Sequence, residues 1–226
     1  MRGIVQGVGF RPFIYRLANR YGLKGTVYND TEGVIIDAEG GADALESFME
    51  DVETQAPPLA RIDHVEFREE TPRSVDGFVI SDSAFTARRT APVPPDAAVC
   101  GDCLREFFSA GDRRYLYPFI TCTNCGPRFS IIFDIPYDRK NTSMAGFAMC
   151  SRCAAEYADP ENRRFHTQPN ACDRCGPHLD LCLPDGTVLS RDTAEIAGIA
   201  VGMIKQGNII AVKGVGGYLI ACDGLN

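Results

Sequence analysis

The chain has 226 residues, which suits one large domain or two to three small ones, and its 45% hydrophobic and 23% charged content is typical of a globular protein. Its formal net charge of −7 argues against general nucleic-acid binding, because affinity for phosphate backbones depends on Lys and Arg. No stretch approaches the roughly 20 apolar residues that span a bilayer, and Gly3 and Gln6 interrupt the N-terminus too early for a signal peptide. We therefore expect a cytoplasmic protein with no nucleic-acid or membrane partner.

Residues 1–82 alternate between strand-like and helix-like patterns. Apolar residues at helical spacing predict helices over Phe10–Tyr21 and Ala42–Val52. A hairpin turn is predicted at Asn29-Asp30. Strands are predicted over Arg2–Gln6, Lys24–Tyr28, Gly33–Ala38, Ile62–Arg68 and Gly77–Ser81. The order β-α-β-β-α-β, with an extra edge strand, is the ferredoxin-like arrangement, so we predict an α+β fold for this part.

The loop between the first predicted strand and the first helix has the character of an anion-binding site. Gly7 and Gly9 let backbone amides turn inward, and the N-terminus of the following helix adds positive potential. Arg11 can grip two phosphate oxygens at once. We predict a phosphate-binding loop formed by Gln6, Gly7, Val8, Gly9, Phe10 and Arg11.

Residues 83–96 are predicted to be a linker, because the proline-rich stretch 90–96 cannot hold a helix or a central strand. Residues 97–182 then contain a duplicated unit with four Cys-x-x-Cys pairs. Arg113-Arg114 recurs as Arg163-Arg164 in the same register. The cysteines of the first copy are Cys100, Cys103, Cys122 and Cys125, and those of the second are Cys150, Cys153, Cys172 and Cys175.

This cysteine spacing predicts two structural zinc ions, because a two-residue spacer lets both sulfurs of a pair face one ion and four thiolates leave no position open for a substrate. Redox chemistry at isolated pairs is the less favoured alternative. Pairing within each copy is favoured, since a duplicated unit should be self-contained, and interleaved pairing remains open. Cys182 and Cys222 have no partner pair and are interpreted as ordinary thiols.

Residues 183–226 begin a different unit. The pattern predicts a helix over Thr193–Gln206 and an apolar strand over Asn208–Lys213, followed by a glycine-rich segment. A helix and a strand that open a sheet do not make a complete domain. We therefore expect these residues to be the beginning of a further domain.

Residues 1–82 resemble acylphosphatase through the segments Val5–Arg11 and Gly25–Val34. The resemblance implies that Arg11 binds the phosphate of an acyl phosphate and that Asn29 positions the attacking water. Taken alone, Arg11 would be a solvated helix residue and Asn29 a turn residue. Both stand on the expected elements, which favours the functional interpretation, whereas His64 and His166 are given no role.

An acylphosphatase-like part followed by two four-cysteine modules resembles the N-terminal part of the hydrogenase maturation carbamoyltransferase family, HypF. The segment Lys213–Asp223 resembles the opening of that family's YrdC-like ATP-binding domain, with Leu219 where the family usually has His. The resemblance implies hydrolysis of carbamoyl phosphate, joining of carbamate to AMP from ATP, and transfer of the carbamoyl group to the partner HypE. It also implies nucleotide binding at Lys213.

Two other functions compete with this interpretation. The first is a non-catalytic, zinc-dependent protein-binding module in which Arg11 and Asn29 have lost their use. The second is a generic acylphosphatase without a role in carbamoyl transfer. Nucleic-acid binding is disfavoured, since Lys and Arg in residues 97–182 are balanced by Asp and Glu.

Overall fold

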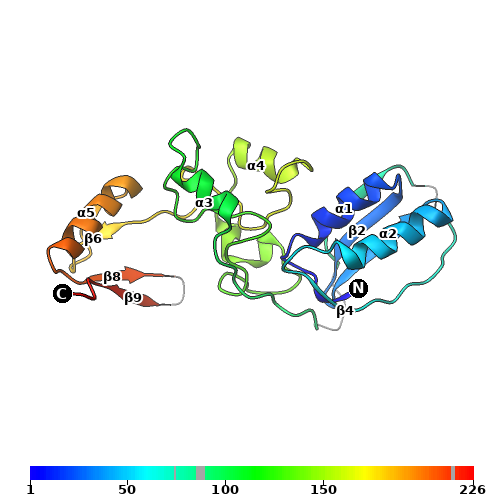
Figure 1. Ribbon diagram of the computed structural model, residues 1–226, viewed down its shortest axis with the longest axis horizontal. Helices are drawn as coiled ribbons and strands as arrows, with labels where there is room; N and C mark the ends of the chain where they lie inside the picture. The colour runs from blue at the N-terminus through cyan, green and yellow to red at the C-terminus, as the bar shows by residue number, and fades with distance from the viewer. Residues whose placement is uncertain (74, 85–89, 215–216) are drawn as a thin grey trace.

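The computed structural model describes residues 1–73, 75–84, 90–214 and 217–226. Figure 1 shows three successive parts: one with α1 and α2 over a sheet, a central part with α3 and α4, and a C-terminal part with α5, β8 and β9. Residues 85–89 of the predicted linker, and Val215 and Gly216 of the glycine-rich segment, lie outside the described residues. Among the described residues, none of the helices combines the length and the apolar character needed to cross a bilayer.

The first part has the predicted order of elements with the extra edge strand. Its helices are α1 (Phe10–Arg20) and α2 (Ala42–Thr54). Its strands are β1 (Arg2–Ile4), β2 (Lys24–Asn29), β3 (Val34–Glu39), β4 (Arg61–His64) and β5 (Phe78–Ile80). This is the ferredoxin-like α+β arrangement.

The strands form two groups, an antiparallel pair and a mixed group of three, that meet edge to edge. β1 pairs with β4, while β2 lies between antiparallel β3 and parallel β5. Met1 and Val34 exchange two backbone hydrogen bonds of 2.8 and 2.9 Å, which join the β1 side to β3. Asn29 and Val34 close the β2–β3 hairpin, so the predicted catalytic amide lies at the end of a central strand.

One strand prediction was wrong in length. The pattern predicts a strand over Ile62–Arg68, but β4 ends at His64. Its partner β1 covers only Arg2–Ile4, so residues beyond His64 have no neighbouring strand to bond. Residues 65–68 are therefore irregular despite their apolar alternation.

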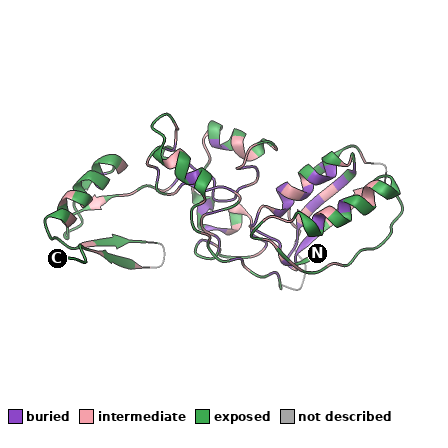
Figure 2. Ribbon diagram, in the orientation of Figure 1, coloured by how far each residue is buried: buried purple, intermediate pink, exposed green. Residues whose placement is uncertain are grey.

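The core of this part lies between the helices and one face of the sheet, where Figure 2 shows the largest run of buried residues. Ile14 and Leu17 of α1 and Val52 of α2 meet Val27 of β2 and Val34 of β3. These side chains are at most 1% exposed, and burying each one stabilises the fold by about 1.5–3 kcal/mol. The packing fixes α1, and with it the loop that precedes α1.

The central part has little regular structure. It contains α3 (Gly101–Phe108), α4 (Ser151–Ala158) and two short 3₁₀ helices, η1 (Arg139–Asn141) and η2 (Ser143–Gly146). Its buried residues gather around the cysteines rather than in one apolar core. So small a core needs an additional constraint such as a metal ion.

The C-terminal part is mostly exposed, as Figure 2 shows. It consists of β6 (Leu181–Cys182), β7 (Val188–Ser190), α5 (Thr193–Lys205), β8 (Ile210–Lys213) and β9 (Tyr218–Ala221). The apolar side chains of β9 stand open, with Tyr218, Leu219 and Ile220 each at least 67% exposed. The structure thus shows a helix and a hairpin whose apolar surface is not covered by the described residues.

Gly25 provides a test of the β2–β3 register. It has φ of 138°, and a Cβ at this position would lie 1.9 Å from the carbonyl oxygen of Asp37 on β3. Gly25→Ala should therefore lower the free energy of unfolding of this part by more than roughly 2 kcal/mol. Urea titration followed by circular dichroism measures the loss.

Gly22→Ala is the matched control. Gly22 also has positive φ, but a Cβ there would meet nothing within 4 Å. Gly22→Ala should lower the free energy of unfolding only by the strain of an alanine in the left-handed conformation, about 1 kcal/mol. Equal losses for the two variants would contradict the observed register.

Candidate functional site

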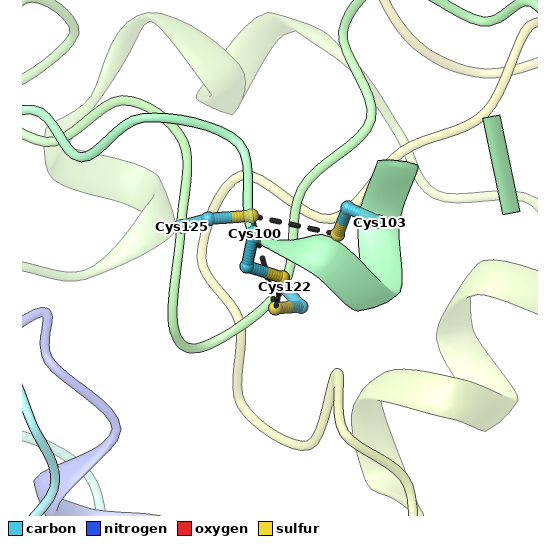
Figure 3. Close-up of side chains that lie close together, drawn as sticks. All are labelled: Cys100, Cys103, Cys122 and Cys125. Atoms are coloured by element: carbon cyan, nitrogen blue, oxygen red, sulfur yellow. Dashed lines mark hydrogen bonds between the residues drawn. The ribbon is translucent and has the colours of Figure 1, made fainter. Parts of the chain in front are cut away.

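Each copy of the duplicated unit gathers its own four cysteine sulfurs. Figure 3 shows Cys100, Cys103, Cys122 and Cys125 pointing toward one another, with Sγ–Sγ distances of 3.4 to 3.8 Å between neighbours. The second copy repeats this arrangement at 3.5 to 3.8 Å with Cys150, Cys153, Cys172 and Cys175. In both clusters all four sulfurs lie within 4.8 Å of one another, so the structure has the within-copy arrangement.

These distances suit zinc. Four sulfurs placed tetrahedrally at the usual Zn–S distance of about 2.3 Å lie about 3.8 Å apart. The neighbouring Sγ–Sγ distances in both clusters lie within a few tenths of an ångström of this value, and the remaining pairs lie within 4.8 Å. With four thiolate ligands an ion has no open coordination position, so its contribution would be structural.

Local structure prepares the sulfurs for a cation. Cys100 and Cys150 directly precede α3 and α4, so their side chains lie at helix N-termini, where the helix dipole favours a thiolate. Burial nevertheless raises the pKa of Cys153 to about 12, although Arg113 lies beside it. A buried thiol of this kind ionises only with a stronger positive charge, which a divalent ion supplies.

Arginines from one copy contact the sulfurs of the other. Arg163 of the second copy approaches the Sγ of Cys103 in the first copy with both terminal nitrogens, at 3.2 and 3.3 Å. Arg113 of the first copy lies 3.3 Å from the Sγ of Cys153 in the second. The exchange is reciprocal, so each cluster depends on the partner copy for positive charge.

The neighbouring arginines complete the same exchange. Arg114 forms an ion pair with Glu156 and donates a hydrogen bond of 2.9 Å to the carbonyl oxygen of Ala171. Arg164 forms an ion pair with Glu106 and donates a hydrogen bond of 3.0 Å to the carbonyl oxygen of Thr121. The recurring Arg-Arg pair was visible in the sequence, but its contacts were not, because they cross between copies.

Removing these arginines should loosen zinc in the opposite copy. Arg163→Met removes two hydrogen-bond donors from Cys103, and Arg113→Met removes one from Cys153. Each variant should therefore lower the zinc affinity of one cluster by roughly 10- to 100-fold. Competition with a chromogenic chelator measures the release of the two ions.

Arg105→Met is the control for this experiment. Arg105 lies on α3 beside the first cluster but pairs with Asp102 and is 75% exposed. It should leave zinc release unchanged. If Arg163→Met and Arg113→Met also release zinc at the parental rate, the exchange between copies has no effect on the metal.

The predicted phosphate loop has the backbone of an anion cradle. Gly7 and Gly9 have φ of 69° and 77°, a conformation that glycine adopts without strain. The backbone amides of residues 6–11 donate no hydrogen bond to any residue that the structure describes. Successive unbonded amides before α1 can together bind an anion.

Arg11 is not a solvated helix residue. Its side chain is 10% exposed. Its guanidinium donates a hydrogen bond of 2.9 Å to the carboxylate of Asp138 and a long one of 3.4 Å to the hydroxyl of Ser83. Asp138 comes from the segment between the two cysteine copies. The carboxylate holds one edge of the guanidinium, and its remaining N–H groups stay available to a phosphate.

The side chain of Asn29 is buried, but only its backbone takes part in the hairpin. It is 1% exposed, and neither its Oδ1 nor its Nδ2 has a hydrogen-bond partner among the described residues. The turn is held instead by Asp30, whose Oδ1 accepts from the amides of Glu32 and Gly33 at 2.9 and 2.7 Å. An unpaired buried amide costs about 1–3 kcal/mol, so Asn29 has the character of a functional residue.

The backbone after β5 ties the two predicted catalytic residues to one segment. Ser83 accepts from Arg11, and the amide of Ala84 donates 2.9 Å to the carbonyl oxygen of Asn29. Gln6 adds a second connection, since its side-chain amide donates to Asp30 and Gly33 at 2.6 and 2.7 Å. The loop, the hairpin turn and this segment therefore form one bonded unit.

A cavity of about 30 Å³ separates the phosphate loop from the cysteine region, enough for one water molecule. Gly7, Gly9 and Arg11 lie on one side of it, and His166 and Thr167 on the other. Asn29 does not line this cavity. Burial, together with repulsion from Arg11, lowers the pKa of His166 to about 4, so this imidazole is neutral at pH 7.

Other residues considered from the sequence lie away from this site. Lys213 ends β8, is exposed, and places its Nζ 5.3 Å from the centre of the Tyr218 ring. Cys182 and Cys222 are exposed free thiols outside both clusters. His64 is exposed at the end of β4.

Comparison with known proteins agrees with this geometry. The acylphosphatase family model matches residues 1–80, and the HypF finger model matches residues 99–132 and 149–182. The acylphosphatase of Thermotoga maritima is 44% identical over 81 residues, covering 35% of this chain and 89% of that protein.

Two longer proteins match the whole chain. The carbamoyltransferase HypF2 of Cupriavidus necator is 52% identical over 229 residues, covering 100% of this chain and 28% of that protein. The crystal structure of full-length HypF in its phosphate- and nucleotide-bound form matches with a TM-score of 0.89 and 45% identity, over 100% of this chain and 29% of that one. The chain thus spans under a third of the length of these relatives.

Proposed function

The chain belongs to the HypF family, and from this premise we propose that its first 80 residues hydrolyse carbamoyl phosphate to carbamate and inorganic phosphate. The observation that carries the proposal is the pair formed by buried Arg11 and buried, unpartnered Asn29, at the positions the acylphosphatase resemblance assigns. The side chain of Asn29 gains no hydrogen bond from its burial, and the guanidinium of Arg11 keeps N–H groups that its partners Asp138 and Ser83 do not use.

Each residue has a distinct part in the proposed reaction. Arg11 and the unbonded amides of residues 6–11 bind the phosphate and stabilise the charge on it in the transition state. Asn29 orients the attacking water through its free amide, which does not titrate. The water adds across the acyl–phosphate linkage, which breaks to release carbamate and phosphate.

For the complete family protein we propose carbamoyl transfer that consumes ATP. Carbamate from the first site would be joined to AMP, and the carbamoyl group passed to a HypE-type partner. The relatives are more than three times as long as this chain, so the transfer needs residues that this chain does not contain.

We assign residues 183–226 to the beginning of the YrdC-like domain, with Lys213 as a nucleotide-binding residue. The uncovered apolar side chains of β9 support a larger unit, since a finished domain buries such side chains. Lys213 stands exposed at the end of β8, before the glycine-rich segment of the sequence, where its ammonium group is open to a phosphate.

Two structural zinc ions complete the proposal. They would be held by Cys100, Cys103, Cys122 and Cys125 in one copy and by Cys150, Cys153, Cys172 and Cys175 in the other. The ions supply folding stability and no reaction step, because all four coordination positions are filled by protein.

Phosphate release from carbamoyl phosphate tests the catalytic proposal. Arg11→Ala should lower kcat/KM by roughly a hundredfold or more, as is typical when a charge-stabilising donor is removed. Arg20→Ala is the control, because Arg20 lies on the same helix and its side chain is 58% exposed. No release by a folded, zinc-loaded parent would overturn the proposal and favour the protein-binding module.

Asn29→Leu separates a catalytic role from a structural one. The near-isosteric side chain removes two unpaired polar atoms, so the free energy of unfolding should stay unchanged or rise by up to about 2 kcal/mol. Phosphate release should nevertheless fall by at least about tenfold, because no amide remains to orient the water. Retained hydrolysis with reduced stability would make Asn29 a structural residue.

A further inference from the structure

The cysteine region contacts the phosphate loop at three neighbouring positions. The amide of Tyr137 donates 3.0 Å to the side chain of Gln6, and Asp138 holds Arg11. Arg128 donates 2.8 Å from its Nε to the carbonyl oxygen of Gly7. The loop is therefore fixed from outside its own domain, by residues more than a hundred positions away.

Arg128 is the link to the metal. Its two terminal nitrogens donate to the carbonyls of Gly126 and Thr123 at 2.7 and 2.8 Å, and these residues directly follow Cys125 and Cys122 of the first cysteine cluster. The side chain is 2% exposed, so all three bonds are shielded from water. The guanidinium of Arg128 thus connects the turn that carries Cys122 and Cys125 to the phosphate loop.

This bridge fixes the direction of a loop amide. A peptide bond is planar and trans, so the N–H of Val8 points opposite to the carbonyl of Gly7. When Arg128 draws that carbonyl toward the cysteine region, the Val8 amide faces away from it and stays free for an anion. Amides set in place before an anion binds cost no reorganisation when it arrives.

We infer that Arg128 is a positioning residue of the acyl-phosphate site. Through Arg128, the turn that holds Cys122 and Cys125 of the first cluster sets the conformation of the phosphate-binding loop. The inference rests on the proposed function and names a residue that the acylphosphatase resemblance does not contain. It gives the zinc region a part in hydrolysis although no zinc ligand touches the substrate.

The test compares Arg128→Met with Arg139→Met in the full chain. Arg139 also donates to three backbone carbonyls, those of Phe147, Gln168 and Asn170, but makes no contact with residues 6–11. Both variants are checked for two bound zinc ions. The readouts are the dissociation constant for inorganic phosphate, by calorimetry, and kcat and KM for carbamoyl phosphate.

Arg128→Met should weaken phosphate binding by about tenfold and lower kcat/KM by roughly 10- to 100-fold, because displaced donors lose most of their effect. Arg139→Met should remain within about twofold to threefold of the parent, because its guanidinium bonds carbonyls of Phe147, Gln168 and Asn170 and none in the loop, and the backbone that carries Asp138 is unchanged. Arg128→Lys should recover part of the phosphate affinity, because an ammonium can still bond the Gly7 carbonyl.

Parental phosphate affinity in zinc-loaded Arg128→Met, or equal losses in Arg139→Met, would overturn the inference. The proposed function fails separately: a parent that binds phosphate but releases none from carbamoyl phosphate is not the hydrolase. In that case the phosphate affinities of the two variants still decide whether Arg128 positions the loop. A folded parent that does not bind phosphate would overturn both.

Discussion

The negative charge of two four-thiolate clusters is the constraint on which the central part depends. A zinc ion leaves each cluster with a net charge of about −2, buried in a region with little apolar core. The structure places arginines of the opposite copy against the sulfurs, where Coulomb attraction is weakly screened. Because the exchange is reciprocal, neither copy has its charge compensated alone, and the duplicated unit behaves as one folded body.

That body also contacts and supports the predicted phosphate-binding loop. The acylphosphatase-like part has its own apolar core, which fixes α1 and β2. The loop before α1 has no comparable packing: it is rich in glycine and leaves its amides unbonded. Contacts from Arg128, Tyr137 and Asp138 supply the missing constraint, and they hold the loop through its carbonyl and side chains while its amides stay free.

Sequence periodicity was sufficient for the parts that depend on local spacing. The order of elements in residues 1–82, the helix from Thr193 and the cysteine repeat all follow from it. It missed α3 and α4, whose eight residues are too short to show a helical period, and it extended β4 beyond its partner strand. It also gave no sign of Asp138 or Arg128, because contacts more than a hundred residues apart leave no local pattern.

Arg11 and Asn29 were assigned through the loop motif and the acylphosphatase resemblance, and their burial became visible only in the structure. Each breaks a local rule, one by burying a guanidinium and the other by burying an amide without partners. Burying the Arg11–Asp138 pair contributes little net stability, since desolvation offsets much of the attraction. With Asp30 already holding the turn, the unpaired amide of Asn29 contributes none. Two departures from stability, joined through the segment after β5 and placed on elements that a large core holds, are what a site arranged for binding an anion and a water requires.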